Sequence, residues 1–151
     1  MKSWLLVLGL VVAVCAPQAA PGSRKKTAPT MGIRVEQRPA AATVGEPATV
    51  QVHVTPPDGI RLNRYPGITL EIDKADALDL STRKAFVGST KPINDVSKFG
   101  FETIDPLVLE FVPKAPGEHV LEGTLKYFYC VKKSGYCAPG QQRVRLPVKA
   151  R

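Results

Sequence analysis

Two cysteines, Cys130 and Cys137, are the residues of this 151-residue chain whose type and spacing are best suited to chemistry. Six residues separate them, with Ser134 and Gly135 in the middle of that segment. Strand-like sequence leads into Cys130 and leaves after Cys137, which is the pattern of a hairpin. Opposed residues of a hairpin have Cβ atoms about 4.5–5.5 Å apart, near the separation that a disulfide needs. We therefore predict one intramolecular Cys130–Cys137 disulfide.

Such a disulfide has two readings, a structural staple or a pair that exchanges with partner thiols. In the chain-entropy model, closing so short a loop stabilises the fold by about 2–3 kcal/mol, which is enough for a staple. Exchange is favoured by the cations Lys132 and Lys133, since nearby positive charge favours a thiolate. It is also favoured by the loop position, because a partner thiolate must reach the sulfur. Aromatic side chains surround the pair in sequence: Tyr127, Phe128, Tyr129 and Tyr136.

Other chemistries have weaker signals in the sequence. His53 and His119 are isolated from each other and from the cysteines, without the paired spacing of a zinc site. The chain has no phosphate-binding loop, no dinucleotide fingerprint and no Ser-His-Asp order. We therefore predict neither a metal site nor a cofactor.

The first 22 residues read as a secretory signal peptide. Residues 1–3 carry a positive charge, residues 4–14 are apolar, and small and polar residues follow. An apolar run of this length is too short to span a bilayer, which takes about 20 residues. We expect the mature protein to be periplasmic or secreted.

The leader also contains Cys15, which raises a lipoprotein alternative in which the chain is anchored to a membrane. Val14 and Val12 stand where acylation sites usually carry a small residue and a leucine, so this alternative is the weaker one. Removal of the leader leaves two of the three cysteines. An even number of cysteines in an exported protein indicates a disulfide, because exported compartments are oxidising.

A basic linker follows at residues 23–31, and residues 32–151 form one domain. Within the domain, apolar residues alternate with polar ones at period two, which indicates half-buried strands. Segments of this kind cover residues 49–54, 68–73, 107–112, 121–130 and 143–148. Turn-forming Pro, Gly and Asp residues fall between them, so the domain is predicted to be an all-β antiparallel sandwich. Residues 74–80 allow at most a turn or two of helix, and residues 81–105 read as a long loop.

Composition supports an ordinary globular domain, with 44% apolar and 23% charged residues. The net charge is +8, but Lys2, Arg24, Lys25 and Lys26 belong to the leader and linker. No basic stripe interleaved with aromatic residues is present, so we expect no nucleic-acid partner.

Over roughly residues 46–149, the chain resembles the N-terminal periplasmic domain of the DsbD thiol:disulfide interchange protein family. The strongest likeness is a strand ending in Cys130, a short polar loop, and then Gly135, Tyr136, Cys137 and Pro139 before a closing strand with Leu146, Pro147 and Val148. Weaker matches are Pro57-Asp58-Gly59 and Lys98-Phe99-Gly100.

The resemblance implies an immunoglobulin-like sandwich and a thiol:disulfide oxidoreductase module that passes electrons to periplasmic thioredoxin-like or other disulfide proteins. It implies that Cys137 is the cysteine that bonds to partners, and that Phe99, or alternatively Phe101, caps the pair. Because the chain ends at Arg151, we expect the reductant to be a separate membrane protein. The alternative function is an immunoglobulin-like protein-binding module with an inert disulfide.

The sequence departs from the family at two places. Six residues separate the cysteines here, whereas the family prototype has five. The aromatic residues expected after the Asp-Gly turn are partly replaced, since Ile60, Arg61, Leu62 and Asn63 stand there.

Overall fold

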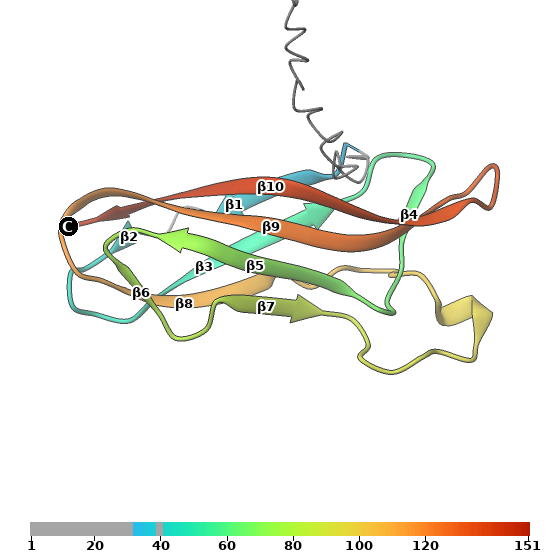
Figure 1. Ribbon diagram of the computed structural model, residues 1–151, viewed down its shortest axis with the longest axis horizontal. Helices are drawn as coiled ribbons and strands as arrows, with labels where there is room; N and C mark the ends of the chain where they lie inside the picture. The colour runs from blue at the N-terminus through green and yellow to red at the C-terminus, as the bar shows by residue number, and fades with distance from the viewer. Residues whose placement is uncertain (1–31, 39–40) are drawn as a thin grey trace, which may run out of the picture.

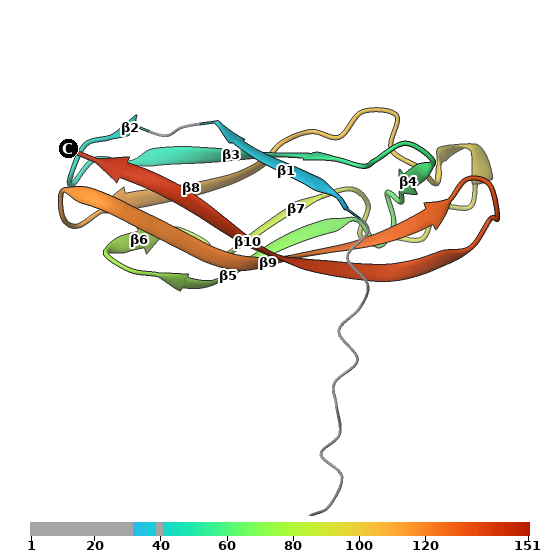
Figure 2. The same cartoon turned by 90° about the horizontal axis from the view of Figure 1, so that it is seen from above.

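A computed structural model describes residues 32–38 and 41–151 of the chain. Two β-sheets lie face to face along the length of the molecule (Figures 1 and 2). The elements are β1 (Arg34–Arg38), β2 (Ala41–Ala42), β3 (Ala48–Thr55), β4 (Ile60–Leu62), β5 (Ile68–Ala75), β6 (Leu78–Leu80), β7 (Lys84–Val87), the 3₁₀ turn η1 (Val96–Lys98), β8 (Leu107–Pro113), β9 (Gly117–Val131) and β10 (Cys137–Ala150).

One sheet has four strands in the order β1-β3-β8-β6, and the other has six. The order in the larger sheet is β2-β10-β9-β5-β7, and β4 pairs with the far end of β9. All strand pairs are antiparallel except the short contact between β2 and β10. The chain therefore forms an immunoglobulin-like antiparallel β-sandwich, as the sequence predicts.

The core lies between the two sheets and follows the alternation in the sequence. Val50, Val52 and Val54 of β3 are buried, and Leu107, Leu109 and Phe111 of β8 are fully buried or nearly so. Ile68, Leu70 and Ile72 of β5 oppose them from the other sheet together with Leu121 and Leu125 of β9. Each of the five predicted strand segments is a strand.

Two segments differ from the sequence expectation. Residues 74–80 are not helical, because β5 continues to Ala75 and turns into β6 through Ala77, which has a φ of 56°. Residues 81–105 contain the short edge strand β7, in which Ala85 is the single buried residue. One buried side chain in four residues is too short an alternation to read from sequence.

The predictions for the leader, the linker and Cys15 fall on residues 1–31, which lie outside the described residues. In the described part of the chain, no helix is long and apolar enough to cross a membrane.

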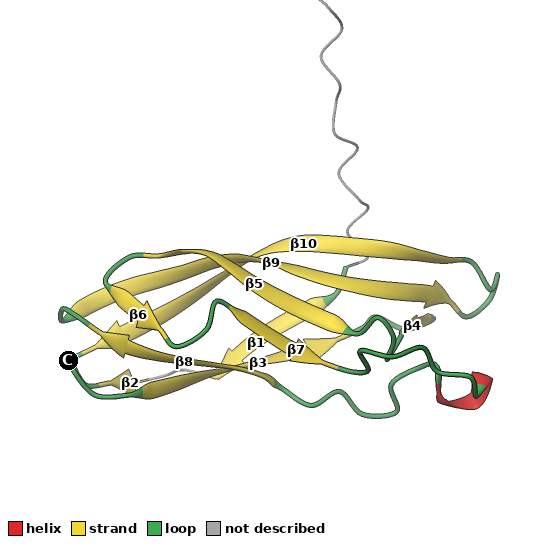
Figure 3. Cartoon of the chain, turned by 60° about the horizontal axis from the view of Figure 1, so that its bottom comes forward, coloured by secondary structure: helices red, strands yellow, loops and turns green. Residues whose placement is uncertain are grey.

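The longest elements are β9 and β10, which form one antiparallel ribbon. Its register runs without interruption from the Cys130–Cys137 pair to the Gly117–Ala150 pair. Residues 132–136, here called the hairpin tip, connect the two strands at the end of the molecule opposite the C-terminus (Figures 1 and 3). The turn η1 lies at the same end in both perpendicular views (Figures 1 and 2).

Candidate functional site

The predicted disulfide is present. Cys130 and Cys137 are the last register pair of the β9–β10 ladder, their Cα atoms are 4.0 Å apart, and their sulfur atoms are bonded. The pair lies at the point where the β9–β10 ladder ends and the hairpin tip begins. The covalent bond therefore closes the ribbon at its free end.

The hairpin tip is a tight turn closed by backbone hydrogen bonds. The Val131 N–H donates to the Tyr136 carbonyl at 2.8 Å, and the Gly135 N–H donates to the Val131 carbonyl at 2.8 Å. Gly135 has a φ of 68°, in the left-handed region that glycine adopts without steric cost. The local sequence thus brings the two cysteines into register.

The two cysteines differ sharply in exposure. Cys130 is 5% exposed, whereas Cys137 is an exposed residue. Cys130 lies on β9, which has a neighbouring strand on each side at this position. Cys130 pairs with Cys137 of β10 on one side and with Arg61 of β4 on the other. Among the described residues, β10 has a second neighbour only at residues 149–150, where β2 pairs with it, so no strand of the described chain covers Cys137. Cys137 is therefore the more exposed of the two cysteines.

The two sulfur atoms also have different nearest polar neighbours. Cys130 Sγ lies 3.5 Å from Oδ1 of Asn63, which directly follows β4, and Cys137 Sγ lies 3.5 Å from the Gly135 carbonyl oxygen. Asn63 is the single polar residue among the buried residues of the described chain, with 9% exposure. Its backbone N–H donates to the Phe128 carbonyl at 2.9 Å, which fixes it beside β9.

Phe99 follows η1 and lies on the segment that pairs with the outer side of β4. Its carbonyl accepts a hydrogen bond from the Arg64 N–H at 2.7 Å. Phe99 lines a small cavity with Asn63, Tyr65, Pro92 and Ile93. It therefore shares a cavity with the residue that contacts the Cys130 sulfur.

Phe101 has a different place. Its N–H donates to the Leu62 carbonyl at 3.1 Å, and its side chain packs against the core. It does not line the cavity that Phe99 and Asn63 share. Of the two predicted cap residues, Phe99 is thus the one that shares a cavity with Asn63, and its capping role remains a prediction.

The aromatic and cationic residues predicted around the pair do not all gather there. Tyr127 and Tyr129 are core residues, with ring centroids 6.3 Å apart, and alternation along β9 directs them to the face opposite Cys130. Tyr136 is 61% exposed, and Lys132 and Lys133 are exposed at the hairpin tip. The tip therefore presents an aromatic ring and two cations to solvent beside Cys137.

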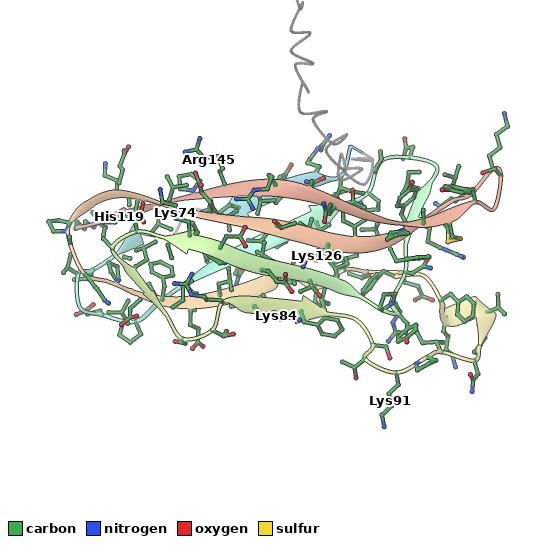
Figure 4. All side chains as sticks on the ribbon, viewed as in Figure 1. Lys74, Lys84, Lys91, His119, Lys126 and Arg145 are labelled. Carbon is green, nitrogen blue, oxygen red and sulfur yellow. A yellow bond between two sulfur atoms is a disulfide. The ribbon has the colours of Figure 1, made fainter. Side chains whose placement is uncertain are left out.

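Among the titratable groups near η1, Asp95 has a lowered pKa because its carboxylate accepts hydrogen bonds from Ser97 and pairs with Lys98. Within residues 32–38 and 41–151, no group of three His, Cys, Asp or Glu side chains is placed to hold a metal ion. His119 lies at the other end of the ribbon, with Nε2 2.7 Å from the Ala115 carbonyl (Figure 4).

Asn63 is the site residue that sequence reasoning missed. Apolar Ile60 and Leu62 alternate with polar Arg61 and Asn63, so the local pattern directs Asn63 away from the core and gives no sign of its burial.

No family model matches the chain, and no curated protein matches it. Two solved structures are similar in shape. The first is a cohesin module from a Clostridium perfringens family 33 glycoside hydrolase, with 11% identity, a TM-score of 0.46, and coverage of 81% of this chain and 100% of that one. The second is AggA, the major subunit of aggregative adherence fimbriae type I from Escherichia coli, with 14% identity, a TM-score of 0.34, and coverage of 79% and 94%. Likenesses this distant carry no argument about function, and they leave the resemblance to the DsbD family a prediction.

Proposed function

We propose that this chain is an exported thiol–disulfide exchange module that passes electrons through the Cys130–Cys137 pair. The observation that carries the proposal is the asymmetry of the pair, in which Cys137 is exposed and Cys130 is 5% exposed. Exchange proceeds by attack of a thiolate on one accessible sulfur, while the other sulfur leaves and later resolves the mixed disulfide. An exposed and a buried sulfur in one disulfide match these two roles.

The steps follow from that geometry. A thiolate of the reductant attacks Cys137 Sγ, the Cys130–Cys137 bond breaks, and Cys130 leaves as a thiolate that takes a proton. A second reductant thiolate then attacks the mixed disulfide, which releases an oxidised reductant and leaves Cys137 reduced. The reduced Cys137 next attacks a disulfide of the target protein, and Cys130 resolves that bond, so that two electrons pass to the target.

The partners proposed are disulfide proteins of the exported compartment, such as thioredoxin-like proteins, and a separate membrane or soluble reductant. The proposal needs no cofactor, because thiols and disulfides supply both electrons and protons. Support comes from the exposure of Cys137, which leaves this sulfur within reach of a partner thiolate.

A second candidate is an immunoglobulin-like protein-binding module with an inert disulfide. A specific observation favours it: the cysteines are a directly opposed pair that closes the free end of the longest ribbon. A staple at that point needs no exchange, and the fold together with the disulfide fits this reading without added chemistry.

Trapping with single cysteine variants separates the two candidates. In the exported fraction of cells, Cys130→Ser leaves Cys137 free to attack but removes the resolving thiol, so mixed disulfides should accumulate on non-reducing gels. Cys137→Ser should trap little, because Cys130 is buried. Equal trapping by both variants would remove the assignment of roles, and no trapping by either would favour the binding module. The wild-type chain and the double variant are the controls.

A further inference from the structure

Asn63 is a polar residue buried directly beside the disulfide. Its Oδ1 lies 3.5 Å from Cys130 Sγ, and no other side-chain hydrogen bond of Asn63 is present among the described residues. A disulfide sulfur carries no proton. In the oxidised protein the Asn63 oxygen therefore faces a sulfur that has nothing to donate.

Reduction changes this contact. Each sulfur gains a proton when the disulfide is reduced, and a thiol is a weak hydrogen-bond donor. A buried acceptor without a donor costs free energy, whereas the same acceptor with a donor contributes a net hydrogen bond. The Asn63 side chain thus has a better partner in the reduced protein than in the oxidised one.

The backbone holds Asn63 in place for this role. Its N–H donates to the Phe128 carbonyl at 2.9 Å on one side, and it forms a bridge with Gly100 on the other. Gly100 is close-packed as well, because a Cβ there would lie 2.3 Å from Cδ of Arg61. Contacts on both sides thus fix the main chain of Asn63 beside β9, and from there its side-chain oxygen reaches the Cys130 sulfur.

We propose that Asn63 is a positioning residue whose Oδ1 accepts a hydrogen bond from the reduced Cys130 thiol and so favours the reduced form of the pair. In the reduction, two reductant thiols form one disulfide and the Cys130–Cys137 bond breaks. Each of the two cysteine sulfurs gains one proton, and the Cys130 thiol then donates a hydrogen bond to Asn63 Oδ1. In exchange, a role that rests on the proposed function, this contact keeps Cys130 protonated while Cys137 reacts. The effect on the equilibrium itself requires no protein partner.

The test is the equilibrium with reduced and oxidised glutathione, followed by acid quenching, alkylation and mass analysis. A Cys15→Ser background leaves the pair as the chain's only cysteines. Asn63→Leu, which is close in size and has no acceptor, should lower the equilibrium constant for reduction about fivefold, the size of one net hydrogen bond. Asn63→Asp, which keeps an acceptor oxygen, should not lower it. Asn94→Leu, the same change at the chain's other asparagine, which is exposed, should leave it within about twofold.

An unchanged constant in Asn63→Leu, or an equal fall in Asn94→Leu, would overturn the inference. If Asn63→Leu does not fold, infrared spectroscopy of Cys15→Ser, Cys137→Ser protein decides the matter, since Cys130 is then the single thiol. Its S–H band should lie at lower frequency in the folded than in the unfolded protein, and equal frequencies would refute the contact. If Asn63→Leu shifts the glutathione equilibrium but no partner is trapped, the exchange function is refuted and the role of Asn63 stands. If partners are trapped but the equilibrium does not shift, the exchange function stands and the role of Asn63 is refuted.

Discussion

The middle of the β9–β10 ribbon and its cysteine end are built from the same two strands but are held in different ways. In the middle, Leu125 of β9 is fully buried and Leu146 of β10 is 2% exposed, and both pack in the core between the sheets. At the cysteine end the register is unchanged, but the ladder ends in a covalent bond with one exposed residue. Core packing thus adds to the strand ladder in the middle of the ribbon, whereas the free end of the ribbon is closed by a covalent bond.

The outer face of the ribbon's middle is polar, and its charged side chains form pairs of opposite sign. Glu71 of β5 pairs with Lys126 of β9 and with Lys84 of β7, and Arg145 pairs with Glu122. The three cations of these pairs are labelled in Figure 4. Exposed pairs of this kind contribute little to stability. The middle of the ribbon is therefore stabilised mainly by core packing, whereas the cysteine end is closed by a disulfide. Four sets of substitutions test this contrast.

The largest effect is expected from Leu125→Ala in the middle of the ribbon. Leu125 is 0% exposed, and its truncation removes buried apolar area and leaves a cavity, which should lower the free energy of unfolding by about 2–5 kcal/mol. Urea unfolding of the oxidised protein measures it. A loss below about 1 kcal/mol would contradict the claim that packing holds the middle of the ribbon.

Removal of the disulfide by Cys130→Ala together with Cys137→Ala should have a somewhat smaller effect. The chain-entropy model gives a loss of about 2–3 kcal/mol for so short a loop, and the strands should stay formed because the ladder continues beyond the pair. Urea unfolding combined with far-ultraviolet circular dichroism checks both statements. Global unfolding of the double variant would show that the disulfide is needed for the fold.

Phe99→Ala should speed reduction of the disulfide by dithiothreitol several-fold, with little effect on stability. The reason is that Phe99 lines the cavity that contains Asn63, next to the Cys130 sulfur. Phe101→Ala is the matched control, since Phe101 packs against the core and should act on stability instead. Stopped-flow reduction of both variants gives the comparison, and an unchanged rate in both would refute the cap.

The smallest effect is expected from Glu71→Gln on the outer face. The hydrogen bond with Lys126 lowers the pKa of Glu71 below its ordinary value of 4.5. A lowered carboxyl pKa contributes stability above pH 4.5 that is lost as the pH falls through the folded-state pKa. The variant should therefore lose less than about 1 kcal/mol at pH 7, and the difference should vanish in acid.

Thermal unfolding of Glu71→Gln and of wild type across this pH range makes the measurement. Glu110→Gln, at an exposed position without an ion pair among the described residues, is the control. A loss at Glu71 that persists at low pH would show that the carboxylate charge is not its cause.

The sequence predicted the sandwich and the cysteine pair because both have local signals, namely period-two alternation and a turn centred on Gly135. It did not predict β4, since three residues such as Ile60–Leu62 carry no readable period and gain their strand character from pairing with β9. Asn63 was missed for the same reason, because its contact with Cys130 spans 67 positions of sequence. Tyr129 is adjacent to Cys130 in sequence, but strand alternation directs its side chain into the core.

The reduction potential of the Cys130–Cys137 pair tests the exchange function most directly. Exchange proteins have potentials between about −120 and −270 mV, whereas structural disulfides of secreted proteins lie below about −300 mV. The measurement is equilibration of the purified protein with a dithiothreitol or glutathione redox buffer, with alkylation of free thiols as the readout. We expect a potential within the exchange range, and a value below about −300 mV would show that the pair is a structural staple.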